Sequence, residues 1–142
     1  MSALFKQYKT DATKENKGVS IPFLEAENED GTIPTFKISR MGKANKRYSK
    51  ALDLASRPHR RSMELGTMIE AVAKTMMLNV FCETVLLGWE NVLDEDGNVI
   101  EFSVENAKAL MLALDEVYIR LTAEANLLDN FKANAVEAEA KN

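Results

Sequence analysis

The hydrophobic positions follow a strand-like pattern near the start of the chain. Two β-prone runs, VSIPFLEA (residues 19–26) and TIPTFKIS (residues 32–39), flank a turn signal at Asp30-Gly31, which is typical of a β-hairpin. Pro22 and Pro34 each lack a backbone donor, so the hairpin should form a sheet edge or a short ribbon. Because two strands are not stable alone, we expect this hairpin, residues 19–38, to pack against helices.

After residue 43 the hydrophobic spacing becomes helical. Between Lys43 and Arg57, apolar residues recur three or four positions apart, and Pro58 should end that helix. Ser62 is expected to cap a second helix that continues to about Leu87. This second segment is apolar around most of its circumference, which is typical of a helix in the middle of a bundle.

The stretch GWENVLDEDGNVIEF, residues 88–102, contains the single tryptophan and an acidic turn signal. We expect a tight turn at Asp96-Gly97, between the β-like runs Trp89–Leu93 and Asn98–Phe102. The indole of Trp89 would supply a large apolar anchor for this turn.

The last part of the chain returns to helical spacing. Ser103 is a suitable N-cap for a helix that starts at Val104. Near Leu114 we expect a break, where Asp115 is a candidate cap for a further helix. One apolar stripe runs through both helices: Leu110, Leu114, Val117, Leu121, Ala125, Leu128 and Phe131.

Together these elements predict a mainly α protein, a small helical bundle with an N-terminal β-hairpin appended as its minor β part. Residues 1–18 are polar and lysine-rich and should form a flexible N-terminal arm. A single mainly helical domain should then span residues 19–138, because the chain contains no internal repeat and no Gly/Pro-rich linker. Residues 139–142 are expected to be a frayed tail.

Composition restricts the class of protein. The 142 residues are 46% hydrophobic and 28% charged, as in ordinary soluble globular domains. The N-terminus has no apolar run typical of a signal peptide, and the longest charge-free stretch in the most apolar region, Thr75–Cys82, is too short to span a bilayer. We therefore expect a cytosolic protein without a membrane partner.

The net charge of −4 conceals a strong asymmetry along the chain. Residues 37–61 hold nine basic side chains and one acidic, whereas residues 62–142 hold five basic and 15 acidic. We call residues 37–61 the basic segment, and a charge block of this kind suggests a partner. The candidate partner-binding residues within it are Lys43, Lys46, Arg47, Lys50, Arg57, Arg60 and Arg61.

The basic segment has two interpretations. It is either an electrostatic contact surface for phosphates or an acidic protein, or a solvated helix face that balances the acidic remainder of the chain. Nucleic-acid binders usually add exposed aromatic residues, and Tyr48 is the one aromatic residue inside the expected helix. We therefore favour a protein contact or intramolecular balance over nucleic acid.

The sequence offers no strong catalytic, metal-binding or cofactor-binding motif, and we expect a non-enzymatic protein. If Gly97 were the sixth position of a calcium loop, Val92 and Ser103 would occupy the first and twelfth positions, and both are wrong ligands. His59 is the single histidine, and Cys82, the single cysteine, lies in an apolar helical run typical of a packing residue. No glycine-rich phosphate loop occurs.

The order of features resembles that of the tail assembly chaperones of long-tailed bacteriophages. Four stretches within residues 36–142 carry the resemblance: FKISRMGKANKRYSKAL, RPHRR, ETVLLGWENVLDEDGNVIEFSVENAKALM and ANLLDNFKANAVEAEAKN. The match rests on order and spacing, and its most specific part is the tryptophan, the acidic turn, the β-like run and the FSxENA helix start.

The resemblance implies a small helical protein that binds the tape-measure protein and recruits tail-tube subunits around it during tail assembly. Such a protein acts in the host cytoplasm and is absent from the mature virion, and self-association is a further candidate contact of this chain. A helical client needs an apolar groove on its chaperone. Methionines would make that surface adaptable, although core packing is the simpler role for most of them: Met63, Met68, Met76 and Met77.

The resemblance also implies a longer form made by a programmed −1 frameshift, because codons for Ala140-Lys141-Asn142 can be spelled as a slippery run. Two other functions stay open. One is a small phage nucleic-acid-binding or regulatory protein that uses the basic segment, and the other is a structural tail or head–tail joining component.

Overall fold

The computed structural model describes residues 2–133. The frayed tail expected at residues 139–142 and the frameshift site expected at residues 140–142 therefore lie outside the described residues. The described part contains these helices and strands: α1 Ala3–Tyr8, α2 Ala12–Lys17, β1 Val19–Pro22, β2 Thr35–Ile38, α3 Lys46–Ser56, α4 Arg60–Glu64, α5 Glu70–Val80, β3 Leu86–Glu90, α6 Val104–Ala113 and α7 Asp115–Asn126.

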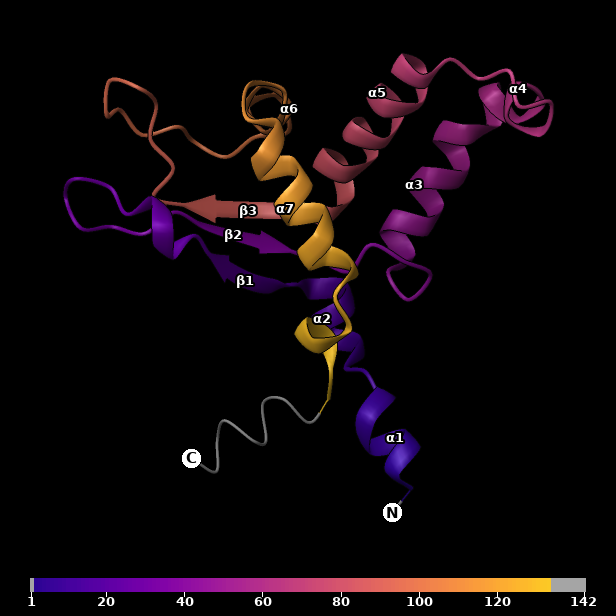
Figure 1. Ribbon diagram of the computed structural model, residues 1–142, viewed down its shortest axis with the longest axis horizontal. Helices are drawn as coiled ribbons and strands as arrows, with labels where there is room; N and C mark the ends of the chain where they lie inside the picture. The colour runs from indigo at the N-terminus through magenta and orange to yellow at the C-terminus, as the bar shows by residue number, and fades with distance from the viewer. Residues whose placement is uncertain (1, 134–142) are drawn as a thin grey trace.

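The strands form a three-stranded antiparallel sheet in the order β1-β2-β3. Helix α7 crosses the sheet, while α3 and α5 project from one end of it as an antiparallel pair joined by α4 (Figure 1). The core lies between the sheet and the helices, where Phe36, Ile38, Phe81 and Leu121 are almost completely buried. The prediction of a mainly α fold with a minor β part is confirmed.

The predicted hairpin forms the first two strands of this sheet. Val19 lies opposite Ile38 and Pro22 opposite Thr35, and β1 is an edge strand, where a proline removes no ladder bond. The connection is longer than the tight turn we expected, because a short 3-10 turn, Leu24–Ala26, precedes the turn closed at Gly31. Gly31 has a φ of +86°, a conformation that favours glycine.

The single helix expected from Ser62 to about Leu87 is wrong. Helix α4 ends at Glu64, and Gly66, with a φ of +68°, turns the chain before α5 begins. After α5 a π-helical turn, Phe81–Val85, leads into β3, which pairs with β2. The apolar run therefore serves first as a helix and then as a sheet strand, a division that periodicity alone does not reveal.

Around the tryptophan the turn and the helix cap are as predicted, but the β-like runs Trp89–Leu93 and Asn98–Phe102 meet only in an isolated bridge between Leu93 and Val99, because β3 ends at Glu90. Asp94 Oδ1 accepts hydrogen bonds from the amides of Asp96 and Asn98, both at 2.9 Å, and closes the expected turn. Ser103 Oγ accepts from the amide of Asn106 at 3.0 Å, so Ser103 caps α6 as predicted. The break also falls at Leu114, although Asp115 is the first residue of α7 instead of its cap.

The N-terminal segment differs from the loose arm that its composition suggested. Helix α1 exposes its apolar side chains, but α2 is held against the rest of the fold. Glu15 of α2 is buried and pairs with Arg40, with 2.7 Å between Oε2 and Nη1. The amide of Asp11 donates to the carbonyl of Phe131 at 2.8 Å, so the two ends of the described chain meet here.

Candidate functional site

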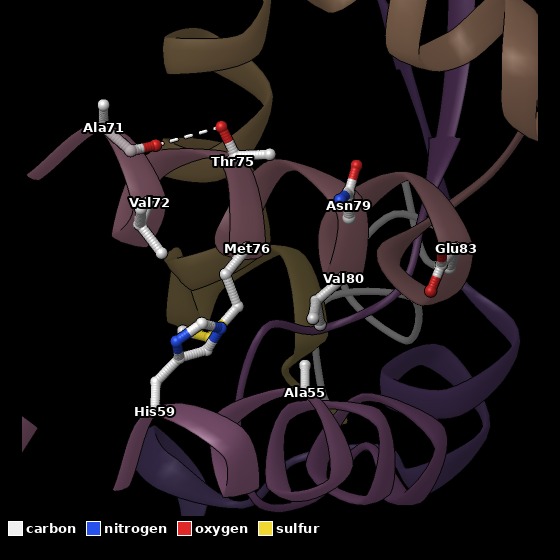
Figure 2. A pocket seen from close by; sticks show the side chains of 9 residues that line it. All are labelled: Ala55, His59, Ala71, Val72, Thr75, Met76, Asn79, Val80 and Glu83. Atoms are coloured by element: carbon white, nitrogen blue, oxygen red, sulfur yellow. Dashed lines mark hydrogen bonds between the residues drawn. The ribbon is translucent and has the colours of Figure 1, made fainter. Parts of the chain in front are cut away.

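A groove lies between α3 and α5, with a volume of about 560 Å³. Figure 2 shows Met76 of α5 extending toward His59, while Ala55 of α3 faces Val80 across the groove. Thr75 lies on the rim, where its hydroxyl donates to the carbonyl of Ala71 at 2.9 Å. The lining residues are Ala55, His59, Ala71, Val72, Thr75, Met76, Asn79, Val80 and Glu83.

The groove exists because α3 and α5 extend beyond the sheet that covers their other ends (Figure 1). At the sheet end, Tyr48 of α3 and Leu78 and Val80 of α5 are buried in the core. At the far end, around α4, the chain leaves large apolar side chains exposed. We call this set the apolar tip: Leu54 (50% exposed), Met63 (47%), Leu65 (64%), Ile69 (68%) and Val72 (38%).

Clustered exposure of this kind is informative. Single exposed hydrophobic residues are common on protein surfaces, but five of them on and around α4, beside a groove, favour an interaction surface. The apolar tip lies next to the groove because Val72 belongs to both. Met76 also lines the groove, and Met63, Met68, Met76 and Met77 are all at least partly exposed, so they can contribute to an adaptable surface.

All seven candidate basic residues lie on the surface, and one of them, Arg47, reaches the carbonyl of Glu83, which lines the groove. Lys46, Lys50 and Arg57 share one helix face by the 3.6-residue period, while Tyr48 and Ala55 lie on the opposite face toward the core and groove. The face that carries Lys46, Lys50 and Arg57 is therefore separate from the groove on the same helix pair.

Some of these basic side chains already have partners. Asp53 pairs with Arg57 at 2.8 Å and with Arg60 at 3.4 Å, and Arg47 Nη2 donates to the carbonyl of Glu83 at 3.1 Å. No ion pair within residues 2–133 involves the other four, namely Lys43, Lys46, Lys50 and Arg61. These four cations remain available for an external acidic surface.

Sequence reasoning located the basic residues but missed the groove. The sequence did contain a sign of the groove. The segment expected as one helix from Ser62 to Leu87 is apolar around most of its circumference, so it holds more apolar residues than packing on two sides would bury. We interpreted that surplus as burial in a bundle centre. In the structure the second half of the segment is buried, whereas Leu65 and Ile69 of the first half stay exposed.

Neither potentially reactive side chain is placed for nucleophilic catalysis. Cys82 is a core residue with 1% of its surface exposed, and its burial raises the pKa of its thiol to about 11. The Lys108 ammonium lowers this pKa, but its effect is smaller than that of burial. His59 lines the groove and is not hydrogen-bonded to Cys82. The thiol therefore behaves as a packing group.

We expect Cys82 to react with an aromatic disulfide reagent at neutral pH at least about 100-fold more slowly in the folded protein than in guanidinium chloride, because a two-unit rise in thiol pKa reduces the thiolate fraction about 100-fold. Absorbance of the released thiolate measures both rates, and Cys82→Ser supplies the blank. Equal rates in the two states would show that the thiol is accessible in the native protein.

The acidic turns do not form a metal centre by geometry. Among residues 2–133, no group of three or more His, Cys, Asp or Glu side chains is arranged to hold a metal ion. Asp30 instead accepts hydrogen bonds from the hydroxyl and amide of Thr32, which lower the pKa of its carboxyl. No helix within the same residues has the length and apolar character needed to cross a membrane.

Comparison with known proteins identifies the origin of the chain. The sequence profile of a family described as YdaY prophage protein matches residues 43–142. No curated protein and no solved structure shows a significant match. The matched region includes the α3–α5 groove, the apolar tip and the seven basic residues. Because the match covers well over half of its length, the chain belongs to the YdaY prophage protein family and is a phage-derived protein.

Proposed function

We propose that this prophage protein is a non-enzymatic tail assembly chaperone that holds a helical segment of the tape-measure protein in the groove between α3 and α5. The observation that carries the proposal is the groove of about 560 Å³ continued by the exposed apolar tip. An amphipathic helix lays its apolar face into such a groove through residues three, four and seven positions apart. The phage origin of the family and the resemblance to tail assembly chaperones support the same role.

The groove suits temporary binding better than permanent assembly. Its walls mix apolar residues, Val72 and Met76, with polar ones, Thr75 and Asn79. Mixed, partly solvated interfaces are typical of partners that separate again, whereas obligate interfaces are larger and more apolar. Release is required of a chaperone that acts in the host cytoplasm and leaves before the virion matures, as we propose for this chain.

The proposed client binding can be tested with variants on the surface of α5. Ile69→Glu combined with Val72→Glu places two carboxylates where the apolar face of the client helix would lie, and affinity should fall at least about tenfold, because burying an unpaired charge costs several kcal/mol. Co-expression with fragments of the tape-measure protein, followed by pull-down and titration calorimetry, measures the loss.

A matched control is available on α6. Leu112 and Val104 are 71% and 38% exposed, close to the 68% and 38% of Ile69 and Val72. The Leu112→Glu, Val104→Glu variant therefore makes the same chemical change away from the groove and should bind normally. If neither double variant changes binding, or if the wild-type chain captures no tape-measure fragment, the proposed function is wrong.

Two alternatives make different predictions. A regulatory protein that binds nucleic acid through the basic segment would be retained on DNA at low salt and released steeply as salt rises. A structural tail or head–tail joining component would be found in purified virions. The proposed chaperone should neither bind DNA at low salt nor be present in purified virions. The proposed longer form, with a tail-tube-binding segment after residue 142, is tested by reading codons 140–142 and the overlapping −1 frame.

A further inference from the structure

We propose that copies of this chain associate head to tail, with the basic outer face of α3 in one copy against two acidic loops in the next. The loops connect β1 to β2 and β3 to α6, and we call them the acidic loops, residues 24–31 and 90–101. The outer face of α3 with its flanking cations is called the basic face: Lys43, Lys46, Lys50, Arg57 and Arg61. This association does not depend on the proposed tape-measure client, and its surface shares one side chain, Leu54, with the apolar tip.

The acidic loops form one surface although they are far apart in sequence. Asn28 Nδ2 donates to the carbonyl of Asn91 at 2.9 Å, and Asn91 Nδ2 donates to the carbonyl of Ile33 at 3.1 Å. The chain has no lysine or arginine in residues 23–36 or 90–107. The exposed acidic side chains on the two loops are Glu25, Glu27, Glu29, Asp30, Glu90, Asp94, Glu95, Asp96 and Glu101.

Little within the molecule neutralises this surface. Arg120 of α7 pairs with Glu25, but no other acidic side chain of the two loops takes part in an ion pair within residues 2–133. On the basic face, all cations except Arg57 are likewise without an ion pair within residues 2–133. Each surface therefore carries charge that no side chain of the same copy pairs with.

The two surfaces lie at opposite ends of the molecule. Figure 1 places both loops at one end of the longest axis and α3 with α4 at the other. In this arrangement the two ends of one copy lie apart, whereas a second copy can present the complementary end. Face-to-face pairing of two identical ends is disfavoured, because it would place like charges opposite each other.

Each surface also has an apolar side chain among its charges. Leu54, 50% exposed, follows Lys50 by one helical turn and is therefore its neighbour on α3. Val99, 68% exposed, lies beside the acidic turn, opposite Leu93 in a β-bridge. A small apolar centre within a charged rim is the usual construction of a specific interface.

A head-to-tail contact uses a different surface from each of the two copies. The resulting pair therefore keeps one unused basic face and one unused set of acidic loops, to which further copies can add. Repetition of such a contact gives a ring if the rotation closes and an open filament if it does not. Because the opposing charges are exposed, salt should screen their attraction beyond about 10 Å at 0.1 M ionic strength. We therefore expect assemblies at low salt that dissociate as salt rises.

The test is sedimentation velocity with charge-reversal variants after nuclease treatment. Wild-type protein should form oligomers at about 0.05 M NaCl and monomers at about 0.5 M NaCl, where the Debye length falls below about 5 Å. Lys46→Glu with Lys50→Glu lowers the net charge of the five basic-face side chains from +5 to +1, and Glu95→Lys with Asp96→Lys lowers that of the nine loop carboxylates from −9 to −5. Each variant alone should remain monomeric at low salt, with association at least about tenfold weaker.

The decisive measurement is a mixture of the two variants. The unmodified acidic loops of the Lys46→Glu, Lys50→Glu copy and the unmodified basic face of the Glu95→Lys, Asp96→Lys copy should associate at low salt, which restores the pairing that each variant lost alone. Lys9→Glu with Lys17→Glu changes the net charge equally but lies on or beside the N-terminal helices, and it should assemble like wild type. Circular dichroism melts verify that each variant is folded.

Three results would overturn the head-to-tail contact: monomeric wild-type protein at low salt, oligomers of either variant alone that match wild type, or a mixture that stays monomeric. Oligomers that disappear with nuclease would assign the basic face to nucleic acid instead. None of these results bears on capture of the tape-measure protein by the groove, so the two proposals can fail separately.

Discussion

Replacement of Trp89 by alanine is expected to lower the free energy of unfolding by about 3 kcal/mol, as for other large-to-small changes in packed regions. The indole is half-buried on β3 and joins three parts of the fold. Its ring packs edge-on against Phe36 of β2, with centroids 5.9 Å apart, and against Phe102, with centroids 5.0 Å apart. Its Nε1 donates to the carbonyl of Ile100 at 2.8 Å.

Urea unfolding followed by circular dichroism measures the change in stability. Trp89→Phe is the informative control, because it keeps an aromatic ring against Phe36 and Phe102 but removes the donor to Ile100. The phenylalanine variant should lose about 1 kcal/mol, the usual net value of one hydrogen bond, with a further contribution from the smaller ring. If the alanine variant is as stable as wild type, the indole contributes no packing and would become a candidate binding residue.

Replacement of Arg40 by alanine should also cost about 3 kcal/mol, because it leaves a buried carboxylate without its cation. Glu15 is 4% exposed, and its Oε2 accepts from Arg40 Nη1 at 2.7 Å. Thr10 Oγ1 donates to the other carboxylate oxygen at 2.9 Å. The Arg40 guanidinium also lies 5.7 Å from the ring centroid of Phe131, so its loss removes a cation–π contact too.

The double variant Glu15→Gln, Arg40→Met separates the two contributions. Removing both charges avoids the unpaired carboxylate, and exchange of a buried ion pair for neutral groups is often close to neutral in stability. The double variant should therefore be more stable than Arg40→Ala, as judged from urea midpoints. If all variants unfold together with wild type, the pair does not hold α2 against the domain, and residues 1–18 behave as the loose arm that their composition suggested.

Local chemistry explains why some elements were predictable. Ser103 caps α6, Asp96-Gly97 and Gly31 lie in turns, and β1 pairs with β2 as the hairpin pattern indicated. In each case the determining interaction joins residues close in sequence, such as a side-chain oxygen and an amide three positions later. Signals of this range depend less on tertiary context than long-range contacts do, although the cap expected at Ser62 did not form because Ser62 lies inside α4.

Strand β3 shows where local signals stop. Leu86 and Leu87 continue the apolar run of the preceding helix without a break, and nothing local distinguishes a buried helix from a buried strand there. The strand forms because β2 offers an unpaired edge, with which residues from Leu86 to Glu90 pair. That edge belongs to residues about 50 positions earlier, so the tertiary structure determines that residues 86–90 form a strand.

The candidate surfaces divide in the same way. The seven basic residues were visible as a charge block, because composition along the chain does not depend on folding. The groove, the exposure of Ile69 and Val72, and the separation of the basic face from the acidic loops depend on where the sheet ends beneath α3 and α5. Hydrophobic patterning shows which residues are favoured in a core. Only the packing of distant elements determines which of them are buried and which remain exposed for a partner.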